Sequence, residues 1–191
     1  MPQALVLGDD ATARYHARQL RPVAGVELVG SEHRRVLRRF LFHSAADDVV
    51  VPHPLMPHLL RDFVAEVLAA DIADPPTGWG LPFETPGADH SLYLSAAAWR
   101  CPATCIEPAH CPVLHAPKDW SLADLIQERA EALGYRPAVF RCLHYANGVA
   151  VVPARDVLQA ARAPLAKGRR MLVATSSHCH AAVGAIQGST T

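Results

Sequence analysis

The sequence predicts an α/β fold in which a doubly wound, mostly parallel sheet of five or six strands is covered by helices on both faces. Short apolar runs of strand length alternate with segments of helical periodicity along most of the 191 residues. Half of the residues are hydrophobic and 19% are charged, which indicates a sizeable core and excludes a disordered chain. We therefore expect a single domain over residues 1–191, with a Cys- and Pro-rich loop inserted in it.

The first thirty residues predict a strand, a helix and a second strand. The apolar run 4–7 ends at Gly8, as a buried strand would. Asp10 is a suitable N-cap for a helix over 11–20, and residues 26–29 predict the next strand. This order and length are typical of one βαβ unit.

The same alternation continues to the end of the chain. Further strands are expected at 49–51, 91–98, 137–142 and 171–175, and further helices at 32–46, 59–70, 122–133, 155–167 and 181–186. Residues 71–90 contain seven Pro and Gly residues and predict an unstructured arm or lid. Residues 187–191 predict a loose tail.

The run LVLGDDATARYHARQL, residues 5–20, resembles the opening of a Rossmann-type nucleotide-binding domain. The resemblance implies that Gly8 forms the phosphate turn, with Asp10 and Ala13 where the second and third small residues stand. It also implies NAD(P) as a ligand, with Glu32 near the ribose or Arg34 near a 2′-phosphate. Alternatively, Gly8 only ends a strand, Asp10 only caps a helix, and Arg34 belongs to a solvated helix face.

The strongest chemical signal lies in residues 100–118. Cys101, Cys105 and Cys111 form a C-x3-C-x5-C array, and His110 and His115 lie among and after them. Thiolates are good ligands for zinc and for iron–sulfur clusters. We expect zinc, with a [4Fe–4S] cluster and a metal-free loop or redox thiol pair as the alternatives.

Two more Cys/His groups, 141–144 and 177–180, follow predicted strands. The carboxyl ends of strands in open α/β sheets form the edge where ligands bind, so we expect both groups to meet the Cys-rich loop there. The fourth metal ligand is then expected among residues of these two groups, first Cys142 or Cys179, and after them His178, His180 or His144. If the zinc keeps an open position, Glu107 or His144 is a candidate proton carrier.

Charge and cysteine content restrict the class of protein. Lys and Arg total 18, as do Asp and Glu, so no global field attracts nucleic acid or an anionic membrane. No apolar run approaches membrane-spanning length, and five cysteines, an odd number, suit a reducing compartment. We expect a cytoplasmic protein that acts on or binds a small molecule or nucleotide.

Three functions remain open at this point. The first, which we favour, is a metal-binding module with a nucleotide or small anion at the same edge. The second is a metal-dependent enzyme with a zinc or iron–sulfur centre. The third is an interaction subunit that docks a protein partner, or a second copy of itself, through the 71–90 arm.

Overall fold

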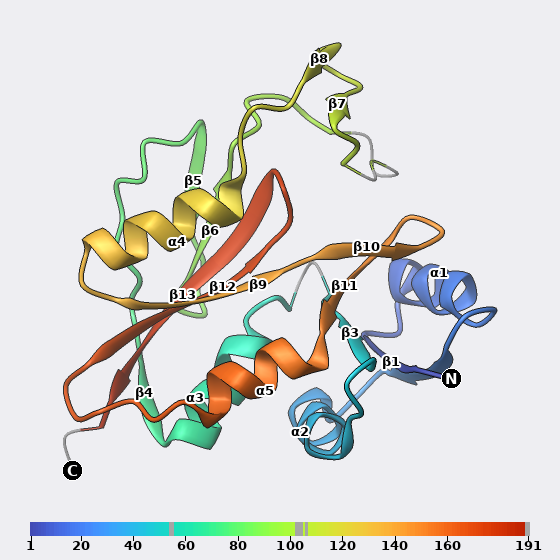
Figure 1. Cartoon of the computed structure of the whole chain (residues 1–191), viewed down its shortest axis with the longest axis horizontal. Coiled ribbons are helices and arrows are strands. Elements are labelled where there is room, and N and C mark those ends of the chain that lie inside the picture. The colour runs from blue at the N-terminus through green and yellow to red at the C-terminus, as the bar shows by residue number, and fades with distance from the viewer. Residues whose placement is uncertain (54–55, 102–104, 106, 190–191) are drawn as a thin grey trace. The chain divides into compact units, whose positions relative to one another are not determined.

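The computed structural model describes residues 1–53, 56–101, 105 and 107–189, and the chain forms two compact units (Figure 1). Unit 1 comprises Met1–Ala69 and Leu143–Pro164, and unit 2 comprises Ala70–Cys142 and Leu165–Thr191. The chain therefore leaves unit 1, forms most of unit 2, returns to unit 1 and ends in unit 2. Among the described helices, none has both the length and the apolar character needed to cross a membrane.

Unit 1 contains a five-stranded sheet of mixed direction, in the order β10-β11-β3-β1-β2. Strand β1 is parallel to its neighbours β2 and β3, whereas β11 is antiparallel to β3 and to β10. The strands are β1 (Gln3–Leu7), β2 (Gly25–Val29), β3 (Val49–Val51), β10 (Leu143–Ala146) and β11 (Val149–Pro153). The helices are α1 (Ala11–Leu20), α2 (His33–His43), α3 (Leu59–Leu68) and α5 (Ala154–Arg162).

Unit 2 contains a second mixed sheet, in the order β5-β6-β13-β12-β9, with β4 also paired to β13. The strands are β4 (Ala70–Ala73), β5 (Phe83–Pro86), β6 (Ser91–Ser95), β9 (Arg136–Arg141), β12 (Arg170–Ser176) and β13 (His180–Gly188). Helix α4 (Leu122–Ala132) packs on this sheet through Leu122, Ile126 and Ala130. A small hairpin of β7 (His110–Cys111) and β8 (Ala116–Pro117) belongs to the same unit.

The predicted doubly wound, mostly parallel sheet is wrong. The described residues form two mixed sheets and a hairpin, in which only the pairs β1–β2, β1–β3 and β9–β12 are parallel. Part of the reason is the Asn147-Gly148 turn, whose residues have φ angles of 49° and 78°. Positive φ at both positions is typical of a type I′ hairpin, which joins antiparallel strands with two residues.

The helix predicted over 181–186 is also wrong, because this segment lies within β13. Its Ala, Val and Ile residues are buried on both faces of the strand, between β12 and β6. A continuous apolar run of this kind fits a central strand as well as a buried helix, and pairing with β12 decides between them.

The predicted unstructured arm 71–90 contains β5 and most of β4, which both pair within the sheet of unit 2. Trp79 between these strands is only 3% exposed. Its indole N–H donates to the Pro76 carbonyl at 2.7 Å, and the Arg129 guanidinium lies over its ring. The tail expected at 187–191 begins inside β13, which extends to Gly188.

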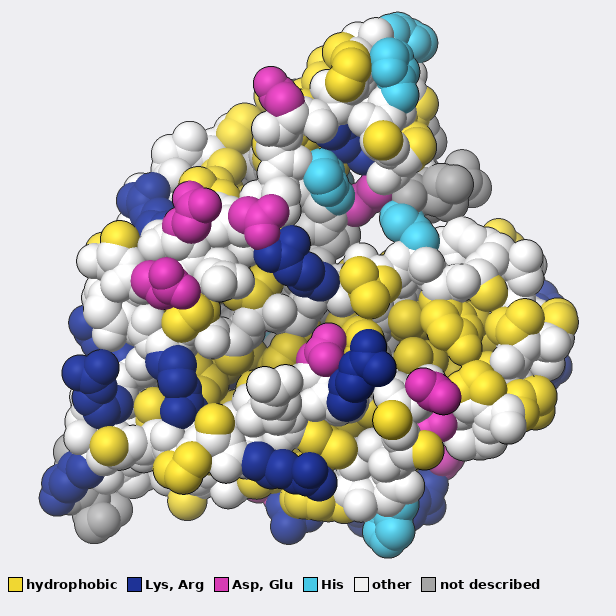
Figure 2. Space-filling model, in the orientation of Figure 1, with side chains coloured by type: hydrophobic (Ala, Val, Ile, Leu, Met, Phe, Trp, Pro, Cys, Tyr) yellow, Lys and Arg dark blue, Asp and Glu magenta, His cyan; other side chains and the backbone are white. Residues whose placement is uncertain are grey.

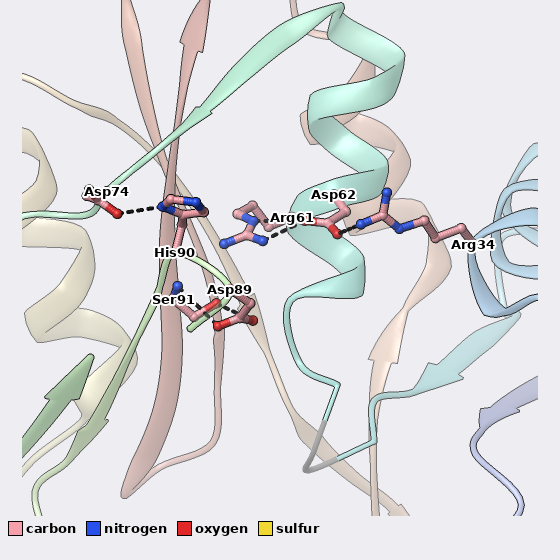
Figure 3. Close-up of polar contacts among 7 residues, drawn as sticks. All are labelled: Arg34, Arg61, Asp62, Asp74, Asp89, His90 and Ser91. Carbon is pink, nitrogen blue, oxygen red and sulfur yellow. Dashed lines mark hydrogen bonds and ion pairs between the residues drawn. The ribbon is translucent and has the colours of Figure 1, made fainter. Parts of the chain in front are cut away.

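Both units contain polar side-chain contacts, of which some are buried and some are exposed (Figure 3). In unit 1, Arg61 Nε and Nη2 donate to Asp62 Oδ1 at 3.0 and 2.7 Å, and both side chains are at most 5% exposed. Arg34 Nη2 donates to the other oxygen of Asp62 at 2.5 Å. In unit 2, Asp74 bonds His90, and Asp89 accepts from the Ser91 hydroxyl.

Candidate metal centre

The turn between β12 and β13 lies at the edge of the unit 2 sheet where several strands end. Because β9 is parallel to β12, with Arg141 opposite Ser176, the carboxyl ends of both strands meet there. The backbone N–H of Cys142 donates to the Ser176 carbonyl at 2.8 Å. The turn itself is closed by Ser177 N, which donates to the His180 carbonyl at 2.8 Å.

Residues on both sides of the Cys-rich segment are attached to this turn through the backbone. Before the segment, the N–H of Ala96 donates to the Cys179 carbonyl at 2.9 Å. After it, the N–H of Leu122 donates to the His178 carbonyl at 3.1 Å. The segment is therefore a loop whose two ends are fixed beside one turn.

Glu107 forms a third attachment, from the middle of the loop. Its two carboxylate oxygens accept from the Ser177 hydroxyl at 2.7 Å and from the His178 backbone N–H at 2.6 Å. Its own N–H donates to Cys105 Sγ at 3.4 Å, and its φ angle of 50° is unusual for a non-glycine residue. Glu107 thus connects Cys105 to the turn that carries Cys179.

The β7–β8 hairpin places Cys111 on the inside of the loop and two histidines on the outside. Cys111 is 3% exposed, whereas His110 and His115 are exposed. Figure 2 shows histidine side chains on the surface over this hairpin. His115 N donates to the Cys111 carbonyl, and Lys118 N donates to the Ala109 carbonyl, both at 2.9 Å.

The pKa shifts of the thiols indicate which cysteines are neighbours. Burial raises the pKa of Cys101, and the charges of Cys105, Cys111 and Glu107 raise it further. Burial also raises the pKa of Cys179, with smaller contributions from Glu107 and Cys101. Cys101 therefore interacts electrostatically with three other thiols, those of Cys105, Cys111 and Cys179.

Cys142 lies in a different environment. Burial raises the pKa of its thiol to about 12, and Glu107 is the charge that adds to this effect among the described groups. A thiol with this pKa stays protonated at neutral pH unless a cation binds it. All five cysteines are free thiols.

Four buried side-chain nitrogen atoms belong to residues near the Cys-rich array in the sequence or to the β12–β13 turn. Within the described residues, Trp99 Nε1, Trp120 Nε1, Lys118 Nζ and His178 Nε2 have no hydrogen-bond partner. The Trp99 indole N–H lowers the pKa of Cys101, and the Trp120 indole N–H and the Lys118 charge lower that of Cys179. Each contact therefore favours a thiolate, although neither indole has a hydrogen bond of ordinary geometry.

Two indole rings and an imidazole ring pack beside these thiols. The Trp120 ring centroid lies 6.2 Å from that of Trp99 and 6.2 Å from that of His178. A hollow of about 640 Å³ adjoins this cluster, and Lys118, Trp120 and Ser121 contribute to its wall. No group of three His, Cys, Asp or Glu side chains in the described part of the chain is close enough to hold a metal ion.

Two further predicted residues of this site, His180 and His144, are exposed. The backbone N–H of His180 donates to Ser177 Oγ at 3.1 Å. His144 lies on β10, which belongs to unit 1. The Cys/His pattern did not single out Lys118, Trp99 and Trp120, although all three lie within nine residues of the Cys-rich array.

In unit 1, the turn after β1 contains the residues that the Rossmann resemblance singled out. Gly8 has a φ angle of 97°, and a Cβ atom there would lie 2.6 Å from His53 Cδ2. Asp10 caps α1 by accepting from Ala13 N at 2.8 Å, and its second oxygen lies 2.9 Å from His53 Nε2. A carboxylate of the protein itself therefore occupies the N-terminus of α1, where a phosphate would bind.

The other two predicted nucleotide contacts are engaged in ion pairs. Glu32 precedes α2 with a φ angle of 51° and pairs with Arg35. Arg34 pairs with the buried Asp62. The same helix carries Arg38 and Arg39, which pair with Glu66 and Glu27.

The Asp10–His53 pair and nearby His16 predict that unit 1 loses stability in acid. Hydrogen bonds from Ala13 N and His53 lower the pKa of Asp10, and burial followed by the His53 charge lowers the pKa of His16. A group whose pKa is lower in the folded state binds more protons when unfolded, so stability is lost as the pH falls below its unfolded value. For His16 that value is 6.5 and for Asp10 it is 3.8.

We therefore expect the free energy of unfolding of unit 1 to fall between pH 7.5 and 5.5, with His16 contributing at most about 1.4 kcal/mol per pH unit. Urea unfolding monitored by circular dichroism at 222 nm measures this, because α1, α2, α3 and α5 all belong to unit 1. The His16→Gln variant should show a smaller pH dependence. An unchanged dependence in this variant would assign the effect to other groups.

The fold and site define a two-unit α/β protein with a cysteine-rich loop attached to the edge of a mixed sheet. Residues 54–189 match a protein-family model, AF_1314_C, described as an uncharacterized protein, C-terminal domain. The chain belongs to this family. No curated protein and no solved structure shows detectable similarity to the chain.

Proposed function

We propose that the chain is a metal-binding protein whose centre is formed by Cys101, Cys105, Cys111 and Cys179, with zinc as the metal. The proposal rests on three buried donors, Trp99 Nε1, Trp120 Nε1 and Lys118 Nζ, which have no acceptor among the described residues and each of which lowers the pKa of Cys101 or Cys179. Buried polar groups are almost always hydrogen-bonded, so each such group needs an explanation. Thiolates bound to a metal supply the missing acceptors.

Charge balance supports the same assignment. Four thiolates brought together repel one another, and a zinc dication removes part of that repulsion. The Lys118 ammonium, which already lowers the pKa of Cys179, offsets more of the remaining negative charge. The Trp99 and Trp120 indole groups then donate to charged sulfur atoms, as groups around metal-bound thiolates commonly do.

Cys179 is a better fourth ligand than Cys142. The charge of Cys101 contributes to the raised pKa of Cys179. The Cys179 backbone carbonyl also accepts a hydrogen bond from the N–H of Ala96, which precedes the loop. Burial and the Glu107 charge both raise the pKa of Cys142, and burial keeps this thiol protonated. Since the described thiols are not yet within one coordination sphere, metal binding would draw the loop toward the turn.

Glu107 acts in this proposal as a positioning residue. Both of its carboxylate oxygens already accept hydrogen bonds from the turn, so it holds Cys105 near Cys179 without itself binding the metal. A cytoplasmic location would keep the five free thiols reduced and available.

A [4Fe–4S] cluster also uses four thiolates and is the alternative to zinc. The hollow beside Lys118 and Trp120 favours a second function, in which the centre acts on a small substrate. Colour separates the two metals, because an iron–sulfur cluster is brown and zinc is colourless. Turnover of a small molecule would be needed to support the second function.

Metal analysis of the purified chain, prepared without oxygen, tests the proposal. We expect about one zinc per chain. Cys101→Ser, Cys105→Ser, Cys111→Ser and Cys179→Ser should each lose most of it, whereas the matched control Cys142→Ser should retain it. A folded wild-type chain that takes up no metal, or equal loss in Cys142→Ser, would contradict the assignment.

A further inference from the structure

A hollow of about 500 Å³ lies in unit 1 between α5 and the residues that follow α2. Leu158, Ala45 and Ala46 form apolar parts of its wall, and Arg155, Gln159 and Arg162 form polar parts. No carboxylate from the described residues lines it. The volume is within the range of small-molecule sites.

Helix geometry places the polar residues of this hollow on one face of α5. Arg155, Gln159 and Arg162 are four and three residues apart, so they follow one side of the helix over two turns. Their Cα atoms span about 10 Å along the helix axis. Two flexible guanidinium groups at this separation can reach toward one ligand from both ends of the hollow.

The two arginines are not neutralised as the arginines of α2 are. Arg34, Arg35, Arg38 and Arg39 each form a salt bridge with a carboxylate. Arg155 has only a 3.7 Å contact with adjacent Asp156, and Arg162 forms no salt bridge within residues 1–53, 56–101, 105 and 107–189. The hollow therefore combines positive charge with an apolar wall.

We propose that this hollow binds a small organic phosphate ester. The two guanidinium groups would donate bidentate hydrogen bonds to the phosphate oxygens, Gln159 would supply a further donor, and the organic part would lie on Leu158 and the two alanines. This site is independent of the proposed metal centre, which belongs to unit 2.

Calorimetric titration of the metal-loaded chain with phenyl phosphate tests this proposal. We expect saturable binding with a dissociation constant of about 1 mM or lower. Phenol should not bind, and inorganic phosphate should bind more weakly, because each lacks one of the two recognised parts. Arg155→Ala and Arg162→Ala should each weaken binding about tenfold.

Arg38→Ala is the matched control, because it removes an exposed arginine that is already paired. It should leave the affinity unchanged, and circular dichroism should show that all three variants remain folded. Absence of saturable binding to the wild type at about 10 mM phenyl phosphate would overturn the proposal. Equal affinities in the wild type and both α5 variants would overturn it as well.

Discussion

Replacing Asp62 with alanine is expected to lower the free energy of unfolding by about 3–5 kcal/mol. Asp62 accepts two hydrogen bonds from Arg61 and one from Arg34, and both Arg61 and Asp62 are almost fully buried. The variant deprives the buried Arg61 guanidinium of this carboxylate, and loss of one partner from a buried ion pair is strongly destabilising. Urea unfolding followed at 222 nm measures the effect on unit 1.

Glu66→Ala is the matched control on the same helix. It removes the Arg38–Glu66 ion pair, in which both side chains are about half exposed. Exposed pairs of this kind contribute at most about 1 kcal/mol. Similar losses in the two variants would mean that burial does not determine the contribution of Asp62.

If unit 2 holds the proposed zinc, removing it is expected to destabilise this unit by more than about 3 kcal/mol. The free energy of binding to a structural zinc site contributes to folding, and it reaches about 10 kcal/mol or more in small zinc domains. All three tryptophans, Trp79, Trp99 and Trp120, belong to unit 2, so their fluorescence reports its unfolding. A chelator should therefore shift the fluorescence transition to lower urea concentration and shift the 222 nm transition less.

The Cys105→Ser variant provides the control for this experiment. Because it lacks one proposed ligand, it should unfold at low urea concentration already, and a chelator should change its transition little. If the chelator removes zinc from the wild type without shifting the fluorescence transition, the centre does not stabilise unit 2. That result would leave metal binding intact and contradict a structural role.

Local patterns in the sequence predicted most of the helices and several strands. Helix α1 and strand β3 coincide with the expected 11–20 and 49–51, and α4 ends one residue before the expected 133. These elements have local signals, such as the Asp10 cap and the Ser121 cap, whose side chains accept from Ala13 N and Asp124 N. The choice between helix and strand stayed ambiguous where a run was continuously apolar, as in β13.

The meeting of two Cys/His groups at one edge of the sheet was predicted, whereas their role stays a prediction. Strand endings brought Cys142 and the 177–180 turn together, because β9 and β12 are parallel neighbours. His144 was placed with them by its proximity in the sequence, yet the chain crosses from unit 2 to unit 1 between Cys142 and Leu143. Zinc, iron–sulfur and NAD(P) ligands all stay predictions.

By itself, the sequence determined the local elements and the presence of a cysteine-rich loop, since capping, periodicity and residue type act over a few neighbouring residues. Only the tertiary structure decided strand direction, the division into two units and which donors surround the thiols. Pairing between strands far apart in the chain depends on the combined burial of both partners, and no short segment encodes it. The tertiary structure was therefore needed to identify Lys118, Trp99 and Trp120, because folding buries their polar atoms and lets them interact with Cys101 or Cys179.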